Sequence, residues 1–212
     1  MLLRLVQQGL ELLYRVETHL DVADFVIDSA TRDAFGLGRA PREQLLVAED
    51  GENLELALFV DEKVLANLAR NDPRERLDER NLQDFLFTVE GVSHFVFFVW
   101  RTRRARPVSA LELELQAEVD KYVTCLLTMW PQNGRPPNNL NEILFERFRL
   151  EPDLNSEERE RYLVANANAR AFAGSLYERF VKRIDLPGML WELRRFYRLG
   201  AQEKLAHIKN AA

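Results

Sequence analysis

The chain has 212 residues, 47% of them hydrophobic and 30% charged, which is enough apolar material for a folded core without disulfides. The formal net charge of −5 argues against a protein that coats nucleic acid, because such a protein needs a basic face to bind phosphates. The single cysteine, Cys125, lies in an apolar run, so an internal disulfide is excluded and a buried, unreactive thiol is expected.

Apolar residues recur at helical spacing from residue 2 to about 28, which predicts a long amphipathic helix. Charged residues such as Arg4, Glu11 and Arg15 interrupt this segment, and it has no small-residue cleavage site, so it does not have the form of a signal peptide. The longest apolar run, FVFFVW, is far shorter than the roughly 20 residues of a membrane span. We therefore expect a soluble, cytoplasmic protein that does not enter a membrane.

Two β-favouring runs flank Asp50-Gly51, a dipeptide that fits a tight hairpin turn. In the second run, leucines and a valine alternate with Glu55, Ala57 and Phe59. The sequence therefore predicts a hairpin over residues 42–60 with one packed face. The segment EKVLANLARND then predicts a helix, and a polar connector follows it at residues 71–80.

Long helices are predicted over residues 81–103 and 109–130, joined by the basic loop RTRRARP. Ser109 and Glu112 have the spacing of a capping box at the start of the second helix. This helix is expected to stop before PQNGRPPNN, the most turn-rich segment and the best boundary between two halves. The remainder predicts helices only: Leu140 to Phe148, Ser156 to about Arg183, and one with Pro187 in its first turn.

Each of the two long helices carries a pair of side chains of the types that can act as metal ligands. Glu90 and His94 are four residues apart, as are Glu114 and Glu118, so each pair lies on one face of its helix. Zinc-binding helices use this spacing in the pattern H-E-x-x-H, where the glutamate activates water. Here the pentapeptide is EGVSH, so a carboxylate stands at the first ligand position and Gly91 replaces the base.

The stretch around EGVSH resembles the active helix of the ImmA/IrrE-like gluzincins, bacterial metallopeptidases with a motif of approximately R-F-T-x-A-H-E-x-G-H. Their second helix, with a pattern like E-x-E-A-N-x-F-A-x-x-L-L, supplies the third zinc ligand. Residues 116–127 are similar to it, with Asp120 at the asparagine position and Tyr122 at the phenylalanine position. The hairpin fits the strands that precede the active helix. The resemblance covers about residues 1–130; His94 matches outright, whereas Gln116 replaces the usual ligand glutamate.

We expect an α+β, mostly α fold. The resemblance implies a zincin-like N-terminal unit over residues 1–130 with a small β-hairpin sheet, and the helical pattern of the remainder predicts a helical C-terminal half over residues 140–212 packed on it. Whether the two halves form one continuous domain stays open. The implied function is a catalytically degenerate zincin-like protein that acts as a binding or regulatory module in a bacterial cytoplasm. We expect a protein partner, and neither nucleic acid nor a membrane.

Three interpretations of the site stay open. In the first, His94 is a packed, hydrogen-bonded histidine with Glu90 as its partner, and the glutamates of the next helix form a solvated face; no cofactor is then expected. In the second, zinc or another divalent metal binds Glu90, His94 and Glu118 without turnover. In the third, the same ligands serve an active hydrolase with Glu114 as the base. A helical interaction scaffold with no metal site is the remaining alternative.

The sequence also contains two clusters of arginine residues. The ordinary interpretation of the loop arginines is a solvated loop next to a helix end, and the alternative is a patch for an anion or an acidic partner, formed by Arg101, Arg103, Arg104 and Arg106. Near the C-terminus, Arg194, Arg195 and Arg198 lie among Trp191, Phe196 and Tyr197, and one interpretation of this cluster is stacking on nucleic acid. At helical spacing these aromatic side chains are expected to fill a core, with the arginines facing water.

Overall fold

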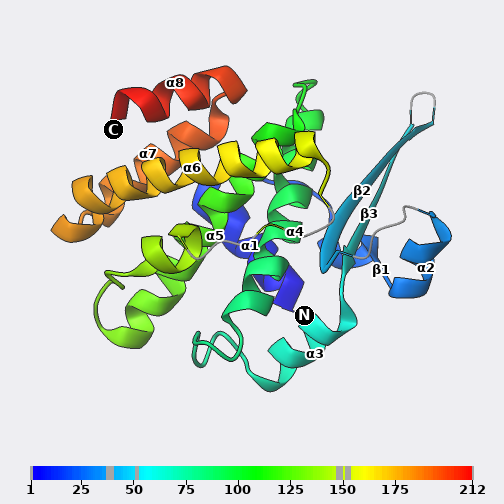
Figure 1. The fold of residues 1–212 in the computed structure, drawn as a ribbon, viewed down its shortest axis with the longest axis horizontal. Helices are drawn as coiled ribbons and strands as arrows, with labels where there is room; N and C mark the ends of the chain where they lie inside the picture. The colour runs from blue at the N-terminus through cyan, green and yellow to red at the C-terminus, as the bar shows by residue number, and fades with distance from the viewer. Residues whose placement is uncertain (1, 37–40, 51–52, 147–149, 151–153, 212) are drawn as a thin grey trace.

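The computed structural model of the chain describes residues 2–36, 41–50, 53–146, 150 and 154–211. Helices make up most of the fold, and a small sheet lies at one side of them (Figure 1). The structure thus confirms the predicted α+β, mostly α class. The α-helices are α1 (Leu2–Tyr14), α2 (Ser29–Ala34), α3 (Glu62–Arg70), α4 (Leu82–Thr102), α5 (Ala110–Asn133), α6 (Ser156–Arg179), α7 (Leu186–Arg198) and α8 (Ala201–Ala211). Shorter helical turns are η1 (Val22–Phe25), η2 (Glu142–Glu146) and η3 (Val181–Arg183).

Helix α1 ends at Tyr14, so the prediction of one helix to residue 28 is wrong. Arg15 adopts a left-handed backbone conformation with φ of 51°, which stops the helix. Polar side chains of α1 then bind the segment that follows: Glu11 accepts from the backbone and hydroxyl of Thr18, and Gln7 accepts from the backbone N–H of Val22. These bonds satisfy a non-helical backbone, and no glycine marks the change in the sequence.

The sheet has three strands in the order β1-β3-β2, where β1 is Val26–Ile27, β2 is Glu43–Asp50 and β3 is Asn53–Val60. Strands β2 and β3 are antiparallel, with Glu43 opposite Val60 and Asp50 opposite Asn53, which confirms the predicted hairpin. Its turn at residues 51–52 lies outside the described residues. Strand β1 pairs parallel to β3 and was not predicted.

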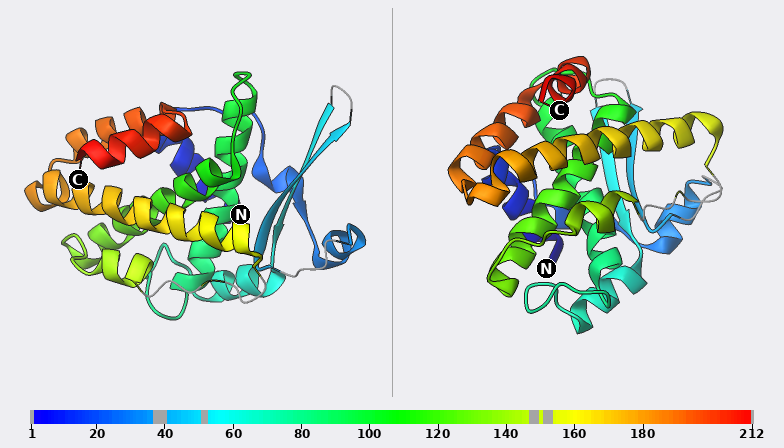
Figure 2. Two further views of the ribbon diagram at one scale, coloured as in Figure 1. Left: turned by 45° about the horizontal axis from the view of Figure 1, so that its top comes forward. Right: turned by 60° about the vertical axis from the view of Figure 1, so that its left-hand side comes forward.

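Burial along β3 changes from one end of the strand to the other rather than from one face to the other. Leu54 is exposed, whereas the consecutive residues Leu58, Phe59 and Val60 are all buried. The prediction of a single packed face is therefore wrong. The end of the hairpin at Asp50 and Asn53 projects away from the helices (Figures 1 and 2). At its other end Phe59 is buried, with the guanidinium of Arg32 over its ring.

Helix α4 is the centre of the fold and contacts α1, α3, α5 and both strands of the hairpin. Figure 2 shows the sheet on one side of α4 and the helical layers on the other. Helix α4 is long and apolar enough to cross a membrane by length and composition, but 61% of that stretch is buried inside the protein, as in a core helix. Its burial follows from its sequence, since phenylalanine and valine occupy all faces of the helix.

Ser109 caps α5 by accepting a bond from the backbone N–H of Glu112, as predicted from their spacing. The helix does not stop at residue 130. It continues past Pro131 to Asn133 and ends at Gly134, whose φ of 69° suits glycine. The predicted stop before PQNGRPPNN is therefore three residues early, because the left-handed glycine, not the proline, ends the helix.

The C-terminal half is helical in its described residues, as predicted. Helix α6 begins at an Asn155–Glu158 capping box and ends at Arg179, where the turn η3 replaces the expected continuation to Arg183. The described part of the helix predicted from Leu140, residues 140–146, is helical and includes η2, and the rest of it lies outside the described residues. Pro187 lies in the first turn of α7, as predicted. Helix α6 packs along α5, and one hydrophobic core contains residues from both halves of the chain.

Candidate functional site

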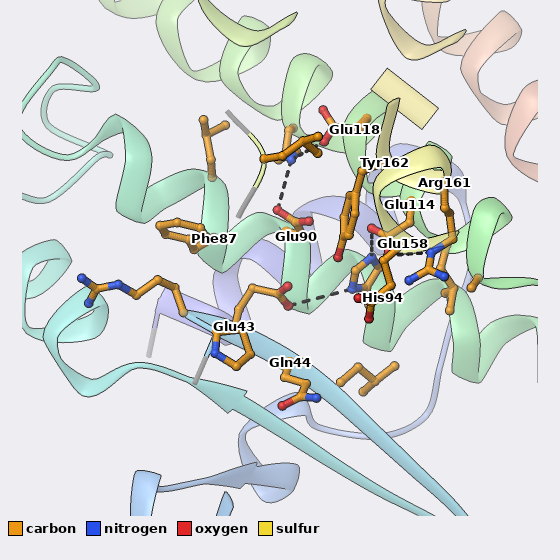
Figure 3. A pocket seen from close by; sticks show the side chains of 18 of the residues that line it. Glu43, Gln44, Phe87, Glu90, His94, Glu114, Glu118, Glu158, Arg161 and Tyr162 are labelled. Carbon is orange, nitrogen blue, oxygen red and sulfur yellow. Dashed lines mark hydrogen bonds and ion pairs between the residues drawn. The ribbon is translucent and has the colours of Figure 1, made fainter. Parts of the chain in front are cut away.

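Four elements far apart in the sequence enclose a pocket of about 830 Å³. Strand β2 forms one wall, α4 and α5 form the floor, and α6 crosses over them (Figure 3). Apolar side chains such as Phe87 and Leu113 alternate in its lining with charged ones. Charged and polar residues that line the pocket include Glu43, Glu90, His94, Glu114, Glu118, Lys121, Arg161 and Tyr162.

Glu90, His94 and Glu114 each offer one ligand atom, and these three atoms lie within 4.8 Å of one another. The Nε2 atom of His94 lies 3.6 Å from Oε2 of Glu114, and Nδ1 lies 3.9 Å from Oε2 of Glu43. Both distances suit ion pairs but exceed a hydrogen bond. The spacing of four residues brings Glu90 and His94 to one face of α4, and the packing of α5 on α4 brings Glu114 to them.

Several polar atoms at this pocket are buried without a hydrogen-bond partner in the part of the chain that the structure describes. Among them are Nε2 of His94, Oε2 of Glu43, Oε1 of Gln44 and Nε of Arg161, and their residues all line the pocket. Buried polar atoms are rarely left unpaired, because each loses its bonds to water. Several such atoms at one cavity are typical of a binding site for a polar ligand or an ion.

The acids of the site determine the charge on His94. Burial alone disfavours the imidazolium, but the Glu114 carboxylate, and then Glu43 and Glu90, outweigh burial and raise the pKa of His94 to about 9. His94 and Arg161 in turn lower the pKa of Glu114, although burial acts in the opposite direction. Burial, helped by the charge of Glu90, raises the pKa of Glu43 to about 8. At neutral pH the site therefore holds an imidazolium beside an ionised Glu114.

Lys121 neutralises Glu90 and Glu118, two of the acidic residues that line the pocket. Its ammonium donates to Glu118 at 2.6 Å and to Glu90 at 3.1 Å (Figure 3). All three side chains are nearly enclosed, with at most 13% of any of them exposed. Burial disfavours the ammonium, but Glu118 and Glu90 more than compensate and raise the pKa of Lys121, so its charge is permanent at any physiological pH.

The donor set of this group fits a divalent transition metal. One imidazole nitrogen and two carboxylates are ligands that zinc accepts, at bond lengths of about 2.0–2.2 Å. The three atoms have to approach one another by roughly an ångström to reach these lengths, which side-chain rotation can provide. The unpaired Nε2 of His94 faces Glu114 and is the atom that would bind the ion.

Gly91 faces the sheet. A Cβ atom at this position would lie 3.0 Å from Oε2 of Glu43 and 3.1 Å from Cδ1 of Leu58, so the glycine allows the hairpin to approach α4 closely. The position where the zincin pattern carries its base is thus adjacent to a carboxylate from β2. Glu43 was not predicted as a site residue, and nothing in the local sequence at the start of a strand would indicate it.

The sequence-predicted residues are brought together in part. Glu90, His94, Glu114 and Glu118 all line the pocket, but Glu114, expected as a base, lies in the group of potential ligands, and Glu118, expected as a ligand, is bound by Lys121. The expectation that the α5 glutamates form a solvated face is wrong, since Glu112, Glu114 and Glu118 are buried. Glu90 accepts a bond from Lys121 and not from His94, its expected partner.

The arginine patch is smaller than expected. Arg101 is buried, with its guanidinium 3.2 Å from Glu112, so it does not belong to an exposed anion site. Arg103, Arg104 and Arg106 are exposed. In the second basic cluster Phe196 and Tyr197 fill the core as expected, but Trp191 is exposed. Arg194 and Arg198 donate to carbonyls at the end of α1, so both serve in packing α7 against α1. Cys125 is buried, and burial raises the pKa of its thiol to about 12.

Comparisons with protein-family models, with curated proteins and with solved structures find no match to this chain. The case for a function therefore rests on the geometry of the pocket.

Proposed function

We propose that the protein is a catalytically degenerate, zincin-like module of the cytoplasm that binds a divalent metal ion through Glu90, His94 and Glu114 and does not turn over a substrate. The observation that carries this proposal is the buried Nε2 atom of His94, which has no hydrogen-bond partner among the described residues, lies 3.6 Å from the Glu114 carboxylate and belongs to a side chain grouped with Glu90 and Glu114. A buried histidine with only a packing role would complete a hydrogen bond at each buried ring nitrogen, whereas Nε2 of His94 has only an ion-pair contact at 3.6 Å.

The absence of turnover follows from Gly91, which has no side chain to accept a proton at the position next to the first ligand. Loss of a general base typically lowers a rate by about 10²–10⁴. Two cations have the same effect. Lys121 and Arg161 form ion pairs with Glu118 and Glu114, the two α5 glutamates that line the pocket and would otherwise be available as bases (Figure 3).

Isothermal titration of the purified, metal-stripped protein with zinc chloride tests the proposal. We expect one ion per chain, and a loss of affinity of at least about tenfold in His94→Ala and in Glu114→Gln, because each removes one of three ligands. The matched control is His19→Ala, since the His19 side chain is 61% exposed. Absence of binding by the wild type, or equal binding by wild type and His94→Ala, would contradict the proposal.

A second candidate function, metal-dependent hydrolysis, is favoured by one observation: the Glu43 carboxylate lies beside Gly91 and has an unpaired buried oxygen. In that case Glu43 would serve as the base, in place of Glu114. The two functions differ in a peptidase assay with a mixture of unstructured peptides and added zinc. Cleavage that disappears in Glu43→Gln but is retained in Glu49→Gln, an exposed residue of the same strand, would favour hydrolysis over binding alone.

A further inference from the structure

Lys121 provides the site with a positive charge of its own. Its ammonium donates to Glu118 at 2.6 Å and to Glu90 at 3.1 Å, and it lies in the same pocket as the three potential ligands. Glu90 belongs to both groups: one of its carboxylate oxygens accepts from Lys121, and the same side chain contributes to the group with His94 and Glu114. An ion held by Glu90 therefore lies close to the lysine ammonium.

Two like charges on one buried carboxylate repel strongly, because little water is present to screen them. A divalent ion also prefers a fourth ligand, and Glu118 is the other α5 carboxylate among the residues that line the pocket. Lys121 engages Glu118 at 2.6 Å, and the two residues are three positions apart on the same helix, so this pair forms without any other element.

We propose that Lys121 is an internal counter-ion that regulates this site: it competes with the metal for Glu90 and withholds Glu118, which becomes a fourth ligand when the lysine moves away. The site then has two states, one with Lys121 bound to both glutamates and one with the metal bound to four side chains. Wild-type protein is consequently a weak, exchangeable metal site and not a permanent one. This inference rests on the proposed metal-binding function.

The proposal distinguishes competition from simple positioning. If Lys121 only held Glu90 in place for the ion, its loss would weaken binding, as is usual for groups that orient metal ligands. If Lys121 competes, its loss strengthens binding. The sign of the change thus decides between the two roles.

The experiment is a zinc titration of wild type, Lys121→Met, Lys121→Gln and Lys121→Arg. We expect both neutral variants to bind zinc at least about tenfold more tightly than wild type, because a buried like charge has been removed, and Lys121→Arg to show no gain. The double variant Lys121→Met/Glu118→Gln is expected to lose most of the gain, since the released ligand is then absent. Circular dichroism and thermal unfolding with and without zinc establish that each variant is folded.

The outcomes separate this inference from the proposed function. Wild type that binds no zinc while a neutral variant does would contradict the proposed function and support the internal counter-ion. Folded neutral variants that bind zinc no more tightly than wild type, or not at all, would overturn the counter-ion role. A double variant that retains the full gain would overturn the assignment of Glu118 as the fourth ligand. Lys121→Gln keeps the test decisive if Lys121→Met does not fold.

Discussion

His94 shows how the chemistry of one residue depends on its neighbours. Its folded-state pKa of about 9 lies above the ordinary 6.5 because Glu114, Glu43 and Glu90 together outweigh burial. A group whose pKa rises on folding stabilises the protein while it is protonated in both states, and this stabilisation is lost as the pH passes through the folded pKa. The favourable contribution of His94 is therefore complete below pH 6.5 and disappears between about pH 6.5 and 9.

We predict that the difference in unfolding free energy between wild type and His94→Asn becomes less favourable to wild type as the pH rises from 6.5 to 9. The change approaches about 1.4 kcal/mol per pH unit within this window. Urea unfolding at several pH values, without metal, measures the difference. His19→Asn serves as the control, because His19 is exposed. A difference that does not change with pH would mean that the acids do not act on His94 as the geometry indicates.

The residue-level part of the site could be predicted only where the information is local. The spacing of four residues places Glu90 with His94, and Glu114 with Glu118, on single helix faces, and the structure brings both pairs to one pocket. The roles within the pocket depend on rotation of α5 against α4 and on which acid meets Lys121. Glu43 and Arg161 belong to β2 and α6, and their positions in the pocket depend on how these elements pack in the whole fold.

At the scale of elements, α4 shows how a glycine can be fixed by tertiary contacts. Glycine in a helix interior lowers stability by about 0.5–1 kcal/mol relative to alanine, so its presence needs a reason. Gly9 in α1 has nothing within 4 Å of an added Cβ, whereas Gly91 in α4 has Glu43 and Leu58 at 3.0 and 3.1 Å. The same substitution at the two glycines therefore isolates the contact between helix and sheet.

We predict that Gly9→Ala raises the free energy of unfolding by about 0.5–1 kcal/mol, because it reduces the entropy of the unfolded chain and meets no neighbour. The free energy of unfolding of Gly91→Ala is expected to be about 1–3 kcal/mol lower than that of Gly9→Ala, since the methyl group at residue 91 displaces buried side chains. Chemical unfolding of both variants with urea gives the comparison. If the two alanine substitutions raised the free energy of unfolding equally, the hairpin would not be in close contact with α4 at residue 91.

The elements themselves were predicted best where a helix or strand has a local signal. The hairpin, α3, α4, the cap of α5 and the proline start of α7 follow from turn residues, caps and apolar spacing. The end of α1 could not be found in this way, because Arg15 and His19 adopt positive φ angles that their side chains do not favour. Tertiary bonds from Gln7 and Glu11 hold that segment, and such bonds are not visible as a pattern along the chain.

On the scale of the whole molecule, a buried polar chain joins the last helix to the first. Lys204 of α8 donates to Gln116 at 2.6 Å, Gln116 donates to Asp120 at 2.8 Å, and Asp120 accepts from the hydroxyl of Tyr14 on α1. Ser93 of α4 also donates to Asp120. In the sequence Lys204 belongs to an ordinary charged helix, so its burial between the rings of Phe97 and Phe196 follows only from the packing of α8.

Burial lowers the pKa of Lys204 from 10.5 to about 7, although Glu112 and Asp120 act in the opposite direction. A group whose folded pKa is depressed in this way favours its neutral form on folding. Between about pH 7 and 10.5 the unfolded chain carries a proton on Lys204 that the folded protein lacks, so stability rises with pH through this window. Below pH 7 both states carry the proton, and the destabilisation is constant.

We predict that wild type gains stability relative to Lys204→Met as the pH rises from 7 toward 10.5, by close to 1.4 kcal/mol per unit, because the variant has no proton to lose. Urea unfolding between pH 7 and 9.5 is sufficient to measure this slope. Lys209→Met in the same helix is the control, since Lys209 is exposed, and its difference from wild type should not vary with pH. If the Lys204 and Lys209 variants gave the same pH dependence, the Lys204 ammonium would have to be in contact with water, and α8 could not be packed over Gln116 as the structure has it.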